Sequence, residues 1–132
     1  MASKPRGRSV VPHVFKITAA KNDQFMAKFV YNSEIMVWSE NYTSKASAKN
    51  CIESIKKNAP DAAMVDLSKG EEAKGYRFEL VESKDGQTFV RFVASNGETM
   101  VRSETYTSKA SAVNCVESIK KNGPGAEVVD ET

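Results

Sequence analysis

The stretch EIMVWSENYTSKASAKNCIESIKKNAPDAAMVD, residues 34–66, returns as ETMVRSETYTSKASAVNCVESIKKNGPGAEVVD, residues 98–130. At this offset of 64, 24 of the 33 positions are identical. Upstream the likeness continues at an offset of 63, where for example Phe15 matches Phe78. A one-residue insertion is tolerated most easily in a tight turn, so the change of offset at 32–33 against 95–97 predicts a hairpin there. The chain is therefore a tandem duplication.

Each copy predicts three strands, a helix and a short last strand. Alternating apolar residues and turn dipeptides place strands at about 14–20, 24–31 and 34–40, and again at about 76–83, 87–94 and 98–104. Ser44 and Ser108, or the threonines just before them, are suited to cap helices whose apolar stripe follows at i, i+3, i+4 and i+7. Short apolar segments at 62–66 and 126–130 fit edge strands. The prediction is an α+β domain with repeats at 14–66 and 76–132 and a linker at 67–75.

The string S-E-x-Y-T-S-K-A-S-A-x-N-C-[IV]-E-S-I-K-K-N-x-P, present twice, resembles the YegP-like proteins, small bacterial proteins of uncharacterised function. The resemblance covers about residues 14 to 130. It implies a β3-α-β unit, used either as a tandem pair or as two single-repeat subunits. The two units form one mainly antiparallel sheet, with the C-terminal strands exchanged between them. The resemblance implies no catalytic residues.

Charge is unevenly placed along the chain. The formal net charge is +2, but Lys4, Arg6 and Arg8 fall in the first thirteen residues, and without them the remainder carries −1. Residues 1–13 are expected to be a disordered basic tail. No apolar run is long enough to span a bilayer and no secretory signal is evident, so a cytoplasmic protein that does not associate with membranes is expected.

The sequence offers little for catalysis. The only histidine, His13, lies outside the repeats, and no metal-ligating cluster or cofactor-binding loop is evident. Cys51 and Cys115 fall on the apolar helix stripes, where burial suppresses thiol reactivity. We therefore expect a non-enzymatic protein that holds no metal ion or cofactor.

Strand alternation divides the sheet into two faces. One face is expected beneath the two helices and carries Phe15, Ile17, Ala27, Phe29, Ile35, Val37, Phe78, Leu80, Val90, Phe92 and Val101. Eight strands at about 4.8 Å spacing form a sheet about 38 Å wide, and two helices cover only part of one face. The opposite face supplies the candidate interaction residues Lys28, Met36, Trp38, Phe89, Arg91 and Arg102.

A second candidate lies where each third strand leads into its helix. A free helix N-terminus there is able to hold an anion, although the same residues also serve as caps and solvated ion pairs. The candidate residues are Glu40, Tyr42, Ser44 and Lys45 in the first copy, and Glu104, Tyr106, Ser108 and Lys109 in the second.

Three functions remain open from the sequence. The first is an interaction or structural module that binds a protein partner, or another copy of itself, through the open sheet face. The second is binding of single-stranded nucleic acid by that face, with rings stacking on bases and cations meeting phosphates. The third is binding of an anion or small ligand at the two strand-to-helix junctions.

Overall fold

The computed structural model describes residues 13–132. The first repeat comprises β2 (His13–Ala20), β3 (Gln24–Tyr31), β4 (Glu34–Trp38), α1 (Lys45–Asn58) and β5 (Ala63–Asp66). The second comprises β6 (Arg77–Glu82), β7 (Thr88–Val93), β8 (Thr99–Arg102), α2 (Lys109–Asn122) and β9 (Glu127–Asp130). Most of the expected tail, residues 1–12, lies outside the described residues. His13 was assigned wrongly to that tail, because it is the first residue of β2.

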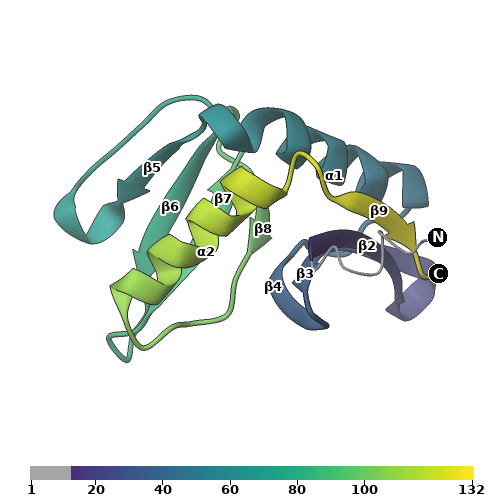
Figure 1. Ribbon diagram of the computed structural model, residues 1–132, viewed down its shortest axis with the longest axis horizontal. Coiled ribbons are helices and arrows are strands. Elements are labelled where there is room, and N and C mark those ends of the chain that lie inside the picture. Colours follow the sequence, from purple (N-terminus) through teal and green to yellow (C-terminus); the bar gives the residue numbers. More distant parts are fainter. Residues whose placement is uncertain (1–12) are drawn as a thin grey trace, which may run out of the picture.

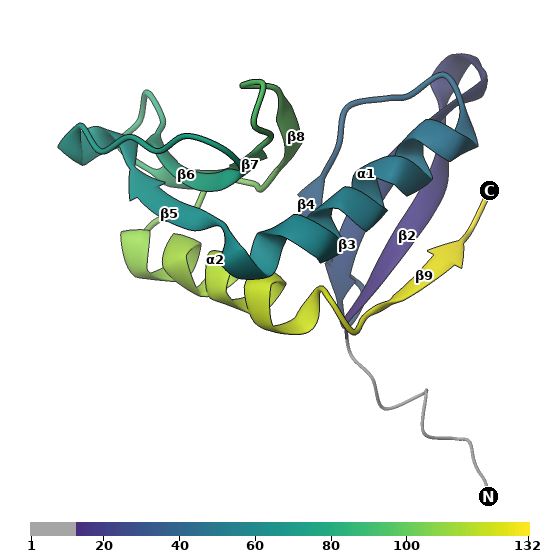
Figure 2. The ribbon, with the colours of Figure 1, turned by 90° about the horizontal axis from the view of Figure 1, so that it is seen from above.

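All eight strands form one mixed sheet in the order β5-β6-β7-β8-β4-β3-β2-β9. Five neighbouring pairs are antiparallel, whereas β5 pairs in parallel with β6 and β9 pairs in parallel with β2. Figure 2 shows β5 beside β6 and β9 beside β2, at the two ends of the sheet. Each short last strand is therefore an edge strand, and its neighbour is the first strand of the other repeat.

The two halves of the sheet meet along a narrow seam between β4 and β8. The only paired residues there are Trp38 and Arg102, which lie directly opposite each other in antiparallel register. By comparison, the β2–β3 hairpin pairs over its full length, from His13 with Tyr31 to Ala20 with Gln24. The backbone ladder therefore joins the halves at one position, and side-chain packing provides the rest of the connection.

Both helices pack on one face of the sheet, as expected from strand alternation. α1 contacts β2 and β3, and α2 contacts β6 and β7, which it crosses in the view of Figure 1. Ser44 and Ser108 cap them by accepting hydrogen bonds from the N–H groups of Ser47 and Ser111. Their buried stripes and the sheet residues beneath form one cluster: Ala48, Cys51, Ile52, Ile55, Ala112, Cys115, Val116 and Ile119 over Phe15, Phe29, Phe78 and Phe92.

Two lysine side chains tie the repeats together beside this core. Lys56 Nζ donates to the carbonyl oxygen of Ala126 at 2.8 Å, and Lys120 Nζ donates to that of Ala62 at 2.9 Å. Each lysine lies in the last turn of one helix and reaches the segment that leads into the last strand of the other repeat. The two contacts are reciprocal, so each helix is bonded to the other repeat.

The hairpin located by the change of offset is confirmed. β3 and β4 are joined by Asn32 and Ser33 alone, whose φ angles of 48° and 73° are both left-handed. Between β7 and β8 the turn is longer and contains Gly97 at φ 89°. A two-residue turn with positive φ at both positions matches the twist of an antiparallel pair, and Asn is one of the few residues besides glycine that adopt such a φ readily.

One core prediction is wrong. Ile35 was expected beneath the helices, but its side chain is 40% exposed. The register between β3 and β4 shifts, so that Phe29 lies opposite Val37 while the adjacent Val30 lies opposite Ile35. The extra residue between them is Met36, and such a bulge reverses the face to which every earlier residue of the strand points.

Candidate functional site

The sheet face opposite the helices, called the open face below, carries a continuous line of in-register side chains. Residues directly opposite each other on neighbouring strands project to the same face. Following the pairing from β6 to β2, that line reads Glu79, Arg91, Arg102, Trp38, Lys28 and Lys16. Its four basic members, Lys16, Lys28, Arg91 and Arg102, are called the cationic row. The row runs across the strands and passes over the seam.

At the centre of the row, Arg102 lies among aromatic rings. Its guanidinium carbon is 4.3 Å from the centroid of the Phe89 ring and 5.8 Å from that of Trp38. Cations over aromatic faces at these distances are attracted by the ring quadrupole. Arg102 is exposed, whereas Trp38 and Phe89 are half-buried. Three of the sequence candidates thus form one contiguous group.

The charges of the row are only partly neutralised. Glu79 is 6% exposed and accepts from Arg91 Nε at 2.7 Å and from Arg77 Nε at 2.9 Å. Burial raises the pKa of Glu79, but the hydrogen bonds from Arg91 and Arg77 outweigh it and hold the pKa below its ordinary value. Lys16 forms an ion pair with Glu131 at 3.0 Å.

Lys28 and Arg102 lack such partners. Neither forms an ion pair with a residue in the range 13–132, and Arg102 donates only to the carbonyl oxygen of Ser103, at 3.2 Å. The row therefore keeps two uncompensated cations, one on each side of Trp38.

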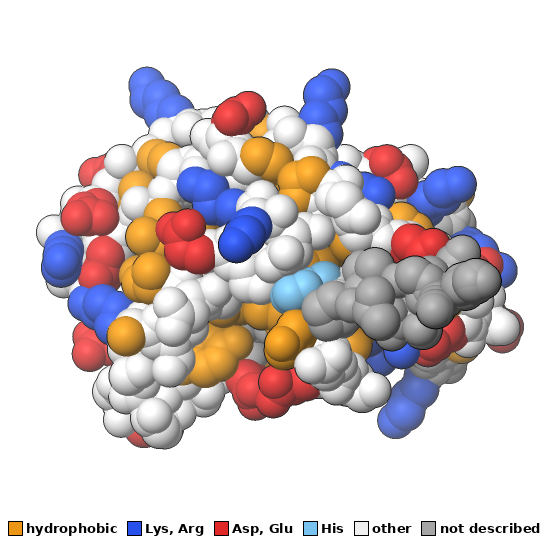
Figure 3. All heavy atoms as spheres, viewed as in Figure 1, with side chains coloured by type: hydrophobic (Ala, Val, Ile, Leu, Met, Phe, Trp, Pro, Cys, Tyr) orange, Lys and Arg blue, Asp and Glu red, His pale blue; other side chains and the backbone are white. Residues whose placement is uncertain are grey.

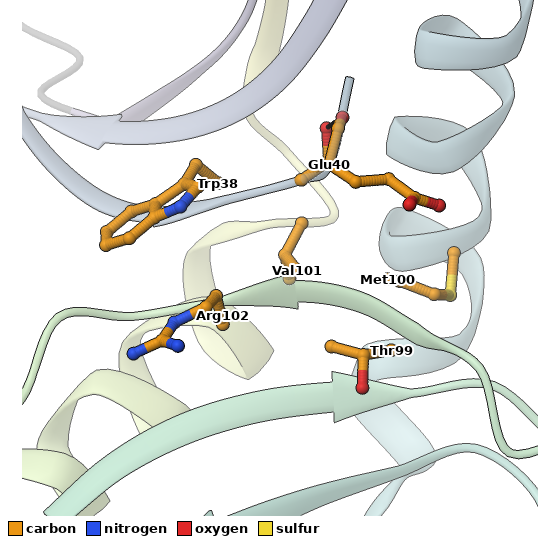
Figure 4. A pocket seen from close by; sticks show the side chains of 7 residues that line it. Trp38, Glu40, Thr99, Met100, Val101 and Arg102 are labelled. Carbon is orange, nitrogen blue, oxygen red and sulfur yellow. Dashed lines mark hydrogen bonds between the residues drawn. The ribbon is translucent and has the colours of Figure 1, made fainter. Parts of the chain in front are cut away.

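Met36 does not belong to this face, and its assignment to the interaction surface is wrong. Met36 and its counterpart Met100 occupy the bulges of β4 and β8 and pack against the core cluster. In Figure 4, Met100 points toward α1, away from Trp38 and Arg102. Val30 and Val93, which alternate with the helix-facing Phe29 and Phe92, are buried as well. The open face therefore loses Met36 but gains the exposed side chain of Ile35, so it presents an apolar residue beside its cations.

A pocket of about 250 Å³ opens beside the seam, where β4 and β8 separate beyond their one paired position. Trp38 and Arg102 form one end of its lining, and Glu40 and Met100 lie farther along the same seam (Figure 4). Its other lining residues are Ser39, Thr99 and Val101. The pocket widens the seam next to the Trp38 ring.

The strand-to-helix junctions are occupied by contacts within the protein. Lys45 Nζ lies 3.0 Å from Asp130 Oδ2, and Lys109 Nζ lies 2.6 Å from Asp66 Oδ2. Ser44 and Ser108 are engaged as helix caps. Each junction lysine is thus neutralised by a carboxylate at the end of the other repeat's last strand, which leaves little positive charge for an external anion.

The two junction tyrosines have structural surroundings. Tyr42 exchanges backbone hydrogen bonds with Phe25, and Tyr106 does so with Thr88. Burial, followed by an interaction with the Cys51 thiol, raises the pKa of Tyr42, and burial and Cys115 have the same effect on Tyr106. The phenols therefore stay protonated at neutral pH. Their companions Glu40 and Glu104 are exposed.

Both cysteines are buried and free. Burial raises the pKa of the Cys51 thiol, and it raises that of Cys115 to about 11. A thiol in this state is a poor nucleophile. Within residues 13–132, no group of three His, Cys, Asp or Glu side chains is placed to hold a metal ion. No helix in the same range is long and apolar enough to cross a membrane.

Sequence reasoning missed two features of the site. The first is Glu79, whose alternation with buried Phe78 and Leu80 already places it on the open face. The second is the buried pair Ser39 and Ser103. Ser103 Oγ accepts a hydrogen bond from Val90 N at 2.9 Å and donates one to Glu104 O at 2.8 Å. These bonds hold the chain against β7 just after β8 ends. A serine between strand and loop gives no distinctive sequence signal.

Comparison with known proteins places these features in a family. The family described as "Domain of unknown function (DUF1508)" matches residues 20–66 and again residues 83–130. A UPF0339 protein of Bordetella pertussis is 40% identical over 101 residues, which are 76% of this chain and 79% of that protein. A shorter UPF0339 protein of Agrobacterium fabrum is 58% identical over 57 residues, which are 43% of this chain and 92% of that protein.

Two solution structures share the fold. The protein of unknown function yegP from E. coli has a TM-score of 0.74 and 26% identity, covering 93% of this chain and 96% of that one. A UPF0339 protein of Shewanella oneidensis has a TM-score of 0.73 and 26% identity, covering 90% and 91%. The resemblance read from the repeated string is confirmed: the chain belongs to the DUF1508 (UPF0339) family of bacterial proteins of unknown function, and carries two copies of its domain.

Proposed function

We propose that this protein is a non-enzymatic binding module that holds an extended anionic partner across its open face. The observation that carries the proposal is the cationic row, four basic side chains in register on neighbouring strands, interrupted only by Trp38. An extended polyanion laid across the strands meets these charges in succession.

Electrostatics within the sheet support this reading. Lys16 lies directly opposite Lys28, and Arg91 lies directly opposite Arg102. Like charges at directly opposed positions destabilise a sheet, so neither pair contributes to the stability of the fold. Carboxylates already pair with one member of each couple, Lys16 with Glu131 and Arg91 with Glu79. A bound anion would supply the missing counter-charge for the other members, Lys28 and Arg102.

Composition separates the open face from the rest of the surface. On the side that carries α2, basic and acidic side chains are interspersed (Figure 3). On the open face the row retains two uncompensated cations beside exposed ring surface. With Met36 and Met100 turned into the core, the apolar character that favoured docking of a protein through methionines is reduced. An anionic partner of either protein or nucleotide chemistry fits better than an apolar one.

The module is proposed to be non-enzymatic because its candidate groups are already engaged. The thiols are buried with raised pKa, the junction lysines are paired with carboxylates, and the junction serines cap helices. Binding of a small anion at the junctions is therefore the weaker alternative.

The test uses labelled inorganic polyphosphate and labelled poly-L-glutamate as probes at low ionic strength, with binding read by anisotropy. The double variant Lys28→Ala with Arg102→Ala should lose most of the affinity. The matched control, Lys57→Ala with Lys121→Ala, removes the same charge from exposed positions on the helices and should bind like the parent. Failure of the parent to bind either probe, or equal losses in both double variants, would refute the proposal.

We also propose that the C-terminal strands are exchanged between the two modules. The parallel pairing of β5 with β6 and of β9 with β2 supports this, as do the ion pairs Lys45–Asp130 and Lys109–Asp66. In each case the last strand of one repeat is held by the other. The Agrobacterium relative, nearly all of whose length matches one repeat, would then complete its sheet by pairing with a second copy.

A further inference from the structure

We infer that the anionic partner is a single-stranded nucleic acid, an inference that rests on the proposed function and names its ligand. A polyanion alone needs cations, but the row also presents planar groups in its centre. Trp38 stands between Lys28 and Arg102, and Phe89 lies beside Arg102 on the same face. Cations on both sides of an aromatic ring suit a strand of bases and phosphates, because bases stack on rings while phosphates pair with cations.

The dimensions of the row fit a short strand. From Arg91 on β7 to Lys16 on β2 there are four strand spacings, which amount to about 19 Å. At about 3.4 Å per stacked nucleotide, about six nucleotides span this distance. Trp38 stands at the midpoint, two strand spacings from either end, so a strand that meets the outer cations passes over the indole.

The geometry around Arg102 indicates where a base stacks. Its guanidinium is 4.3 Å from the Phe89 centroid but 5.8 Å from that of Trp38. The guanidinium is therefore held mainly by Phe89 and covers the indole only loosely. The pocket beside the seam adjoins the same indole. A base can therefore stack on the Trp38 ring without moving the Arg102 guanidinium from the Phe89 ring. From that position Arg102 reaches the phosphate next to the stacked base.

A duplex or an acidic protein segment uses the face less well. In a duplex the base planes are stacked on one another, and the open face offers no protruding element to read a groove. An acidic peptide supplies carboxylates to the row but no regular series of planar groups for Trp38. A duplex and an acidic peptide can both interact with the cations. The single strand differs from them in that its binding should depend on the Trp38 ring.

The experiment compares a fluorescein-labelled ten-nucleotide oligothymidylate with a self-complementary duplex of the same length and with polyphosphate, all at low salt. The single strand should bind most tightly, and its affinity should fall with salt by about 0.7 in log K per tenfold change in salt for each phosphate neutralised. Binding should quench the fluorescence of Trp38, the only tryptophan of the chain.

Substitutions at Trp38 then isolate stacking from charge. Trp38→Leu should weaken oligothymidylate binding about tenfold and leave polyphosphate binding unchanged, while Trp38→Phe should retain most of the affinity. Lys57→Ala with Lys121→Ala is again the charge control, and far-ultraviolet circular dichroism checks that each variant is folded. Polyphosphate or the duplex binding as tightly as the single strand, or Trp38→Leu leaving its affinity unaltered, would overturn the inference. If binding of polyphosphate still depended on Lys28 and Arg102 in that case, the proposed binding of an anionic partner would stand and only its identification as single-stranded nucleic acid would fall.

Discussion

The ion pair between Asp66 and Lys109 gives a direct test of how the two repeats hold each other. Asp66 ends β5 of the first repeat, and Lys109 begins α2 of the second. The Asp66 carboxylate accepts from Lys109 Nζ at 2.6 Å and from the Ser68 N–H at 3.0 Å. These bonds, led by Lys109, lower the pKa of Asp66 from 3.8 to about 2.

The contribution of the Asp66 ion pair to the free energy of unfolding follows from that pKa. A fall from 3.8 to about 2 corresponds to at most about 2.5 kcal/mol of stability at neutral pH. The Lys109 side chain is 45% exposed, so solvent screening reduces this, and we expect about 1–1.5 kcal/mol. Asp66→Asn keeps an oxygen able to accept from Ser68 but removes the charge. It should lower the free energy of unfolding by that amount at pH 7.

The sign of the pH dependence is fixed by the direction of the pKa. The folded state lowers the pKa of Asp66, so its contribution is fully present above about pH 4 and disappears as the pH falls toward 2. The difference in stability between the parent and Asp66→Asn should therefore shrink over that interval. Urea unfolding followed by Trp38 fluorescence, repeated from pH 7 to pH 2, measures it.

The duplication supplies a matched control at Asp130. Its pKa is also lowered to about 2, chiefly by the Thr132 hydroxyl, but its side chain and that of Lys45 are each 48% exposed. Asp130→Asn should cost clearly less than Asp66→Asn because water screens the pair. Equal losses in the two variants, or a difference for Asp66→Asn that stays constant down to pH 2, would refute the reasoning.

Three other predictions follow from burial and pairing. Residues 67–132 alone should sediment as a dimer, because β9 lacks its neighbour β2 in that fragment, and a stable monomer would contradict strand exchange. Cys51 and Cys115 should react with a thiol reagent at least a hundredfold more slowly in the native protein than in urea, and equal rates would contradict their burial. Glu79→Gln should lower stability while raising affinity for polyphosphate, because it frees two guanidinium groups, and a fall in both would argue against the cationic row.

The repeat allowed much of the fold to be predicted from sequence. Nearly identical helices in both copies located the buried stripes and narrowed each cap to a serine or the threonine before it. The stripes are confirmed, and the caps are Ser44 and Ser108. The change of offset located the Asn32–Ser33 turn because insertions concentrate where the chain reverses. These features depend on residues near one another in sequence, which is where periodicity and capping act.

The bulges could not be predicted in the same way. Met36 and Met100 each sit in a strand that alternates regularly, with no glycine or proline to mark an irregularity. The extra residue is accommodated because the methionine side chain fills the edge of the core beneath the helices. That packing depends on the helix positions, so period-two alternation assigned Ile35 and Met36 to the wrong faces.

The candidate site was only partly predictable. Alternation brought Trp38, Phe89 and Arg102 to one face, and the structure places them in contact. It did not reveal that β4 and β8 are neighbours, since these strands lie in different repeats and pair at one position only. The cationic row exists only because of that pairing, so its continuity across the seam was beyond sequence analysis.

Some of the differences between the copies lie on the open face and change the charge or the ring there. Core positions keep their character, as in Phe15 with Phe78 and Phe29 with Phe92, whereas Lys16 is matched by Glu79 and Trp38 by Arg102. A face used only for symmetric self-association has no need for the two halves to differ. A single strand of nucleic acid, the ligand that we propose, has two distinguishable ends. The row has the Trp38 indole on one side of the seam and the Arg102 guanidinium on the other, so such a strand should bind it better in one orientation. The asymmetry of the face is therefore compatible with a directional ligand on a nearly symmetric scaffold.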